Sequence, residues 1–273
     1  MTSALTITRF APAPTGHLHI GHVVNALHVW ETARRERARV LLRIEDHDRQ
    51  RSRTEFEASI LEDLAWLGFV ADGSLVRQSE RSEIYEAALA RLRTQGLVYA
   101  CECSRQEILA SVAQPSSAAT SELRYPGTCA SKNLPDAPGR ALRVRLPRSE
   151  ERFDDLLLGP QIQVATEQCG DLVARDRHGN WTYQFAVTVD DFDQGVTLVI
   201  RGTDLLTSTG RQIQLSRMVG RTEPPRFMHH PLVMKSAMQK LSKSDRDTGI
   251  REMRAAGASP GSVLALARKL ASL

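Results

Sequence analysis

The sequence predicts an α/β protein whose parallel sheet is doubly wound, and three observations support this fold class. Strand and helix patterns alternate over residues 5–96, which is typical of parallel strands joined by crossover helices. A compact apolar strand returns at residues 197–202 and leads into a further helix. Between these two parts, residues 100–180 contain short alternating stretches, which indicate a β-rich insert.

The first part of the chain contains strands and helices with clear boundaries. Apolar alternation predicts a first strand, which a Pro-rich turn beginning at Pro12 ends. Thr54 and Glu57 form a capping-box pattern at the start of a later helix, and Gly68 ends that helix. The expected elements are strands at 5–10 and 40–45, and helices at 23–37, from 54 to Gly68, and at 82–95.

The second part begins with the insert. Alternating stretches at 141–146, 161–164 and 181–189 predict strands, and a helix is expected to begin near Ser208. Two short helical stretches follow Thr248. The expected division is a main domain at 1–99 and 181–245, an insert at 100–180 and a short helical C-terminal segment at 246–273.

Composition is that of a soluble globular protein, with 41% apolar and 25% charged residues. The first twenty residues lack a basic start followed by an apolar run, and eighteen apolar residues never occur in a row. We therefore expect a cytoplasmic protein without a membrane partner. We also expect a monomer. The net charge of +4 favours a polyanionic partner such as RNA, although an arginine-rich solvated helix face explains the same charge equally well.

The strongest motif is His19-Ile20-Gly21-His22, which follows a strand and a Pro/Gly turn and opens a helix. A helix N-terminus offers free N–H groups and a positive dipole end, which suit the phosphates of a nucleotide. Gly21 leaves room for a flat base on the backbone, and two imidazoles three residues apart share one helical face. Two histidines at such a spacing are otherwise often zinc ligands or surface residues.

A second motif, Lys240-Leu241-Ser242-Lys243-Ser244, lies about 220 residues further along the chain. Two lysines around a serine predict a cationic loop that closes on a triphosphate and neutralises the departing pyrophosphate. A solvated Lys/Ser loop is the alternative for this motif taken alone. The two motifs in this order, at the two ends of a doubly wound domain, are much more specific than either one.

Together the motifs resemble the HIGH and KMSKS signatures of class I aminoacyl-tRNA synthetases, with Leu241 in place of the usual methionine. The resemblance covers essentially the whole chain and implies a Rossmann-like catalytic domain. It implies ATP and Mg²⁺ as reactants in the formation of an aminoacyl-adenylate. The catalytic residues that it implies are His19, His22 and Lys243, and the ATP-binding residues are His19, Gly21, His22, Lys240 and Lys243.

Three flanking segments, at 9–22, 43–46 and 200–205, are similar to those of glutamyl-tRNA synthetases. An amino acid with two carboxylates needs two cationic contacts and one anion for its ammonium group. Arg9 and Arg201 lie at strand ends, where a doubly wound sheet places its ligand, although each could instead form a structural ion pair. The residues implied for L-glutamate binding are Arg9, Ala11, Ala13, Glu45, Tyr183 and Arg201, with Ala13 replacing the usual serine.

The sequence ends about thirty residues after the second motif, so we expect no anticodon-binding domain. This architecture resembles the glutamyl-queuosine tRNA(Asp) synthetases, which activate glutamate without tRNA and attach it to queuosine in the anticodon stem-loop. A short or truncated glutamyl-tRNA synthetase that charges a tRNA 3′ end is one alternative. A non-catalytic RNA-binding relative is another, although the presence of His19, His22 and Lys243 argues against it.

Four cysteines occur, at positions 101, 103, 129 and 169, and close pairs in a chain without a secretion signal indicate metal ligands. The resemblance implies one structural zinc ion held by Cys101, Cys103, Tyr125 and Cys129. Without the resemblance, Cys169 would be the first choice as fourth ligand, because tyrosine is an unusual one. Buried cysteines without a metal are the alternative.

Overall fold

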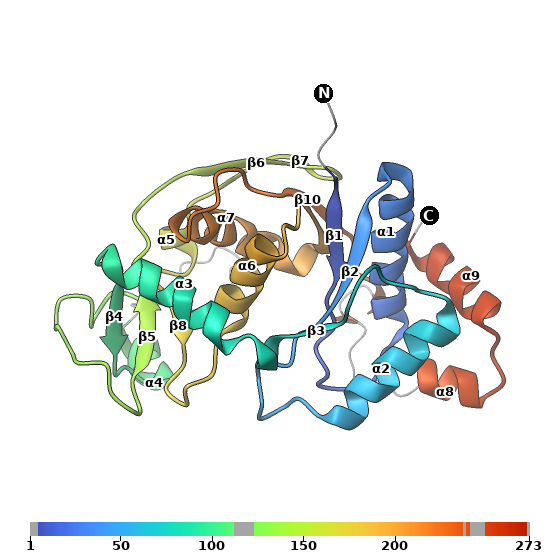
Figure 1. Ribbon diagram of the computed structural model, residues 1–273, viewed down its shortest axis with the longest axis horizontal. Coiled ribbons are helices and arrows are strands. Elements are labelled where there is room, and N and C mark those ends of the chain that lie inside the picture. Colours follow the sequence, from blue (N-terminus) through green and yellow to red (C-terminus); the bar gives the residue numbers. More distant parts are fainter. Residues whose placement is uncertain (1–4, 112–122, 237–238, 241–248, 272–273) are drawn as a thin grey trace.

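The computed structural model describes residues 5–111, 123–236, 239–240 and 249–271 (Figure 1). Its elements are β1 (Ile7–Phe10), α1 (Ile20–Glu36), β2 (Arg39–Ile44), α2 (Thr54–Leu67), β3 (Val76–Arg77), α3 (Ser82–Thr94), β4 (Val98–Cys101), α4 (Arg105–Ser111), β5 (Ala141–Val144), β6 (Glu151–Asp155), β7 (Gly159–Gln163), α5 (Ala165–Gln168), β8 (Leu172–Arg175), α6 (Tyr183–Asp193), β9 (Leu198–Gly202), α7 (Thr209–Met218), β10 (Arg226–His230), β11 (Met234–Ser236), β12 (Gln239–Lys240), α8 (Ile250–Ala255) and α9 (Pro260–Ala271).

Two parallel βαβ halves meet at β1 and β9. In one half β1, β2 and β3 pair in parallel, and in the other β9 pairs in parallel with β10. The Thr197 N–H donates to the Ile7 carbonyl at 2.9 Å, which joins the halves beside β1. The predicted α/β fold with a parallel sheet is confirmed. Arg9 on β1 and Arg201 on β9 therefore lie where the strand order reverses, the usual place for a ligand in this architecture.

The hydrophobic core has two main parts, one on each side of this junction. Helix α1 packs between the first sheet and the C-terminal helices, where Ile250 and Val263 are fully buried in the same cluster as Val24. A second cluster joins α3, α6 and α7 to strands β4, β5 and β8. Figure 1 shows the β4–β5–β8 sheet at one end of the molecule and α8 and α9 at the other.

The region expected to be β-rich contributes to two different sheets. Strands β4, β5 and β8 form an antiparallel sheet of their own. The β6–β7 hairpin, also antiparallel, joins the main sheet instead, because Asp155 of β6 pairs with Phe227 of β10. The domain boundaries at 99, 180 and 245 stay a prediction.

Two local expectations were wrong. Residues 181–189 were expected as a strand, but most of them form helix α6. Seven consecutive residues of this helix, 185–191, are buried, so this stretch has no exposed polar face and the helical period is hidden. The capping box at Thr54 is also absent, because Arg53 is the N-cap of α2 and makes no side-chain cap hydrogen bond.

Among the described residues, no helix combines the length and the apolar character that a bilayer crossing requires.

Candidate active site

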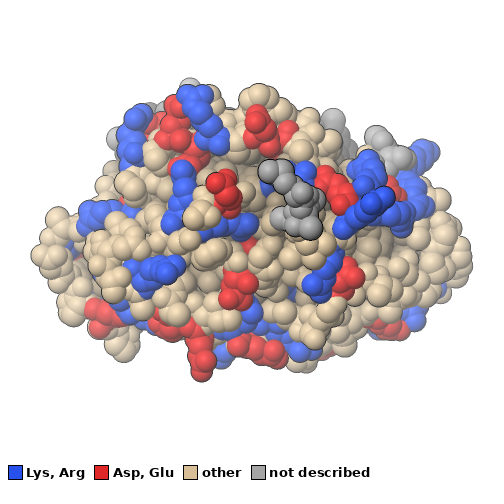
Figure 2. Space-filling model, turned by 45° about the horizontal axis from the view of Figure 1, so that its top comes forward, with Lys and Arg blue, Asp and Glu red and all other residues tan. Residues whose placement is uncertain are grey.

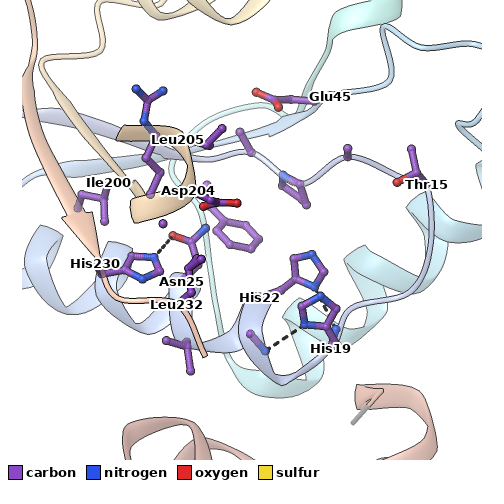
Figure 3. Close-up of a pocket in the computed structure, with 18 of the residues that line it drawn as sticks. Thr15, His19, His22, Asn25, Glu45, Ile200, Asp204, Leu205, His230 and Leu232 are labelled. Carbon is purple, nitrogen blue, oxygen red and sulfur yellow. Dashed lines mark hydrogen bonds between the residues drawn. The ribbon is translucent and has the colours of Figure 1, made fainter. Parts of the chain in front are cut away.

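A cavity of about 540 Å³ lies where β1, β2 and β9 end and α1 and α6 begin. Figure 3 shows His19 and His22 together at the start of α1, with Glu45 across the cavity from them in this view. The structure thus brings together nine residues that the sequence had singled out from positions far apart in the chain. They are Arg9, Ala11, Ala13, His19, Gly21, His22, Glu45, Tyr183 and Arg201.

His19 and His22 are oriented by the backbone at the start of α1. The Gly21 N–H donates to Nδ1 of His19 at 3.1 Å, and the His19 N–H donates to Nδ1 of His22 at 3.0 Å. Their ring centroids are 3.8 Å apart. Because both Nδ1 atoms accept hydrogen bonds, each neutral ring carries its proton on Nε2. The pair is therefore set to donate hydrogen bonds to an anion beside the helix N-terminus.

Gly21 has a role that the sequence did not reveal. A Cβ atom at this position would lie 2.9 Å from Cε1 and 3.0 Å from Nδ1 of His19. The absence of a side chain at Gly21 is thus what allows the His19 ring to fold back onto the helix start. The proposed contact between Gly21 and a nucleotide base stays a prediction.

Arg9 belongs to a buried network of charges. Its Nε lies 3.0 Å from Oδ1 and 3.3 Å from Oδ2 of Asp191, at the end of α6. Arg43 donates to the same Asp191 at 2.8 Å and to Glu45 at 3.1 Å. Burial alone would lower the pKa of Arg43, but Asp191, Glu45 and Asp190 outweigh this effect and raise it. A carboxylate therefore balances the charge of Arg9 before any ligand arrives.

The positive charge near Glu45 does not fully offset the effect of burial on its carboxylate. It is only 6% exposed and lines the cavity directly after β2. Burial raises its pKa, although Arg43, Arg9 and His47 favour the charged form. A cationic group in the cavity would therefore stabilise the Glu45 carboxylate.

Arg201 shows the opposite imbalance. Its Nε donates to Nε2 of His229 at 3.0 Å, its Nη1 to Oε1 of Gln212 at 2.7 Å and its Nη2 to Oγ1 of Thr209 at 2.8 Å. Within the described part of the chain, no carboxylate forms an ion pair with it. Burial lowers the pKa of Arg201, while the nearby Tyr183 opposes this change. An anion in the cavity would stabilise this guanidinium.

Tyr183 is the first residue of α6 and lines the cavity near both imbalanced groups. Burial raises its pKa, and the negative charge of Glu45 adds to the effect. The phenol is consequently protonated at neutral pH and can donate a hydrogen bond to a ligand oxygen.

The second motif lies mostly outside the described residues, and Lys243 is among those not described. Lys240 lies in β12, which pairs with β11, and its side chain is likewise not described. Directly after the motif, Gly249 forms a β-bridge with His19, and the Ile250 N–H donates to the Leu18 carbonyl at 3.0 Å. The chain that follows the motif is thus attached to the start of α1.

Three of the four cysteines form a cluster. The sulfur atoms of Cys101, Cys103 and Cys129 lie within 4.8 Å of one another. The Tyr125 hydroxyl lies 3.4 Å from Cys101 Sγ and 3.9 Å from Cys103 Sγ. A tetrahedral zinc ion with Zn–S bonds of about 2.3 Å spaces its sulfurs by about 3.8 Å, so these atoms fit the corners of such a site.

Cys169 does not belong to this group of three cysteines. Its Sγ donates to the backbone carbonyls of Ala165 and Gly170, at 3.3 and 3.2 Å. Tyr125 therefore suits the fourth position better than Cys169 does.

Several residues of the site escaped the sequence analysis. Charged residues within apolar runs could have indicated three of them. Arg43 lies in VLLRIE, and Asp190 and Asp191 lie in VTVDDF. Local sequence held no such signal for His229, since its partners come from β6 and β9. His229 belongs to the site because it is buried between polar side chains of the neighbouring strands.

The distribution of surface charge gives little indication of where a partner binds. On the face in Figure 2, Lys and Arg side chains are interspersed with Asp and Glu side chains. The described part of this face carries no continuous basic patch. The charges on this face therefore do not indicate where a partner binds.

Comparisons with known proteins agree with this geometry. Residues 6–271 match the family model for tRNA synthetases class I (E and Q), catalytic domain. The glutamyl-Q tRNA(Asp) synthetase of Janthinobacterium sp. is 43% identical over 242 residues, which cover 87% of this chain and 81% of that protein. The glutamyl-Q tRNA(Asp) synthetase of Rhodobacter capsulatus is 40% identical over 275 residues, which cover 94% and 98%.

A solved structure is also similar. The glutamate tRNA ligase of Elizabethkingia meningosepticum, determined in complex with its amino acid, matches with a TM-score of 0.74 and 29% identity. The match covers 89% of this chain and 52% of that protein, so the chain spans about half the length of the solved ligase. The chain belongs to the class I tRNA synthetase family for E and Q, and within it to the glutamyl-Q tRNA(Asp) synthetases.

Proposed function

We propose that the protein activates L-glutamate with ATP and transfers it to queuosine in the anticodon stem-loop of tRNA(Asp). The observation that carries this proposal is the charge imbalance of one cavity. Glu45 is paired with Arg43, but this pairing does not offset its burial. Arg201 has no carboxylate partner among the described residues, and both side chains line the same space. Glutamate supplies an ammonium group for the first and a side-chain carboxylate for the second, and its α-carboxylate stays available for reaction.

Activation is the first step. The glutamate α-carboxylate attacks the α-phosphate of ATP, which gives glutamyl-adenylate and pyrophosphate. The Nε2–H groups of His19 and His22 stabilise the charge that develops on the phosphates, and Lys240 and Lys243 neutralise the departing pyrophosphate. Mg²⁺ would supply further positive charge to the phosphates. A nucleic-acid hydroxyl then attacks the acyl carbon and releases AMP.

A structural zinc ion is the second part of the proposal. Cys101, Cys103, Tyr125 and Cys129 would hold it, since their donor atoms already lie close together. Such a site would fix Tyr125 beside β4 and β5, where Arg143 stacks 3.5 Å from the centre of its ring. The zinc would thus order the end of the antiparallel sheet.

The names of the relatives support the proposed RNA partner. The two bacterial proteins above are named for tRNA(Asp), which favours this acceptor over others. We propose that the anticodon stem-loop lies where a glutamate tRNA ligase would receive an acceptor stem. Its short duplex presents phosphates on both sides, and the net charge of +4 supplies a general attraction. A cytoplasmic monomer is sufficient for this reaction.

The first experiment is ATP–pyrophosphate exchange without RNA. Exchange is expected with glutamate and is expected to be weak with glutamine, whose neutral amide leaves the charge of Arg201 unbalanced. Equal exchange with the two amino acids would refute the assignment of the substrate. Absence of exchange with either one would favour the non-catalytic relative.

The second experiment locates the transferred glutamate. A queuosine-bearing anticodon stem-loop of tRNA(Asp) is expected to accept labelled glutamate about as well as the whole tRNA, while the unmodified stem-loop accepts none. The competing candidate, charging of a 3′ end, is favoured by the structural match to a glutamate tRNA ligase. Label on the terminal adenosine of unmodified tRNA(Glu) would support that candidate.

A further inference from the structure

Arg9 and Arg201 face the same cavity but differ in the charge of the groups that hold them. Both oxygens of Asp191 lie within 3.3 Å of Nε of Arg9, so this arginine is already paired with a carboxylate. The partners of Arg201 at Nε, Nη1 and Nη2 are an imidazole, an amide oxygen and a hydroxyl. Arg201 is therefore fixed in geometry without being neutralised.

His229 is neutral because of its own neighbours. Oδ2 of Asp155 lies 2.6 Å from Nδ1 of His229, so Nδ1 carries the proton and Nε2 accepts from Arg201. Burial, together with the charge of Arg201, lowers the pKa of His229 to about 4. The charge of Asp155 is in turn stabilised by the N–H groups of Leu157 and Leu158 at 3.0 and 3.1 Å. The imidazole thus separates this carboxylate from Arg201.

We infer that His229, Gln212 and Thr209 form a neutral cage that determines the selectivity for glutamate over glutamine. They keep the guanidinium of Arg201 in place and leave its positive charge for the side-chain carboxylate of the substrate. A carboxylate in the cage would neutralise Arg201 first, and a neutral side-chain amide would then fit as well as an acid. This inference rests on the proposed function, and it assigns selectivity to residues behind the arginine.

Gln212→Glu tests the inference with almost no change of shape. It places a carboxylate oxygen where Oε1 now lies, 2.7 Å from Nη1 of Arg201. The Nε2 of Gln212 now donates to Gln184, which in turn donates to Ser208. Rotation of the Gln184 amide by half a turn reverses both hydrogen bonds, because the Ser208 hydroxyl can also donate. The new carboxylate is therefore accommodated without an unsatisfied group.

The measurement is kcat/KM for glutamate and for glutamine in ATP–pyrophosphate exchange. The ratio of the two values is expected to fall by at least about tenfold in Gln212→Glu, as a new ion pair with Arg201 replaces the one with the substrate. The matched control, Gln212→Met, removes the amide without adding charge. It is expected to lower kcat/KM for glutamate but to retain the ratio. If Gln212 had a merely structural role, Gln212→Glu and Gln212→Met would affect the ratio in the same way.

A second variant adds the same charge from another side of the cage. Thr209 is the first residue of α7, where an aspartate suits the helix dipole, so Thr209→Asp is expected to fold and to lower the ratio similarly. If both carboxylate variants keep the wild-type ratio, the inference is wrong while the proposed function stands. If the wild type itself gives no glutamate-dependent exchange, the proposed function is wrong and the cage has no selectivity to explain.

Discussion

Substitution of Gly21 by alanine should lower activity without lowering stability. The new Cβ would lie 2.9 Å from Cε1 of His19, whereas an ordinary carbon–carbon contact is about 3.5 Å, so the ring must move by about 0.6 Å. That movement also disturbs the 3.1 Å hydrogen bond from the Gly21 N–H to Nδ1 of His19. A misplacement of about 1 Å in a catalytic group can cost roughly 10²-fold in rate, so we expect a loss approaching that size.

Stability should change little. Gly21 lies inside the first turn of α1, where alanine is a better helix former than glycine by up to about 1 kcal/mol. The atoms that obstruct the new Cβ belong to a side chain that can rotate away, so the backbone need not shift. Rotation of the ring weakens the N-cap that His19 provides, and this loss is of the same size as the gain in helix propensity. The melting temperature of Gly21→Ala is therefore expected to lie close to that of the wild type.

The assay is ATP–pyrophosphate exchange at saturating glutamate, combined with thermal unfolding by circular dichroism. Gly261→Ala is a matched control, because Gly261 is also the second residue of its helix, α9, and the nearest atom to its new Cβ is 3.9 Å away. The control is expected to retain normal exchange. Exchange by Gly21→Ala within about twofold of the wild type would refute the importance of the folded-back His19 ring.

Three further outcomes are expected. Lys243→Ala should lower the exchange rate by roughly 10²-fold with little change in the KM for glutamate, and near-normal exchange would assign this lysine to a solvated loop. Elemental analysis should find one zinc per chain, lost in Cys103→Ser and retained in Cys169→Ser, and the reverse pattern would transfer the fourth position to Cys169. Asp63→Asn should stabilise the protein above pH 6, because burial raises the pKa of Asp63 from 3.8 to about 6. The ionised carboxylate then costs up to about 3 kcal/mol, a cost that is absent below pH 3.8 and complete above pH 6. Equal melting temperatures of the two proteins at pH 7.5 would contradict this.

The order of the elements could be predicted because local patterns report it directly. Strand β2 is a compact apolar run and α2 ends at Gly68, whose φ of 78° is the left-handed conformation that glycine favours. The two nucleotide motifs and the arginines at the ends of β1 and β9 were also recognisable in the sequence. Helix α6 was missed, since its burial on nearly all sides removes the polar face from which a helical period is recognised.

Residue types at strand ends, together with the resemblance to a known family, thus indicated several of the side chains that reach the cavity. The charge that each of them presents there was decided by the tertiary structure. Arg9 is neutralised by Asp191, 182 positions away, while Arg201 meets only neutral acceptors from α7 and β10 among the described residues. Two arginines that look equivalent in sequence therefore differ in what they can bind. The physical reason is that the charge balance of a buried group depends on which remote partners replace its lost water.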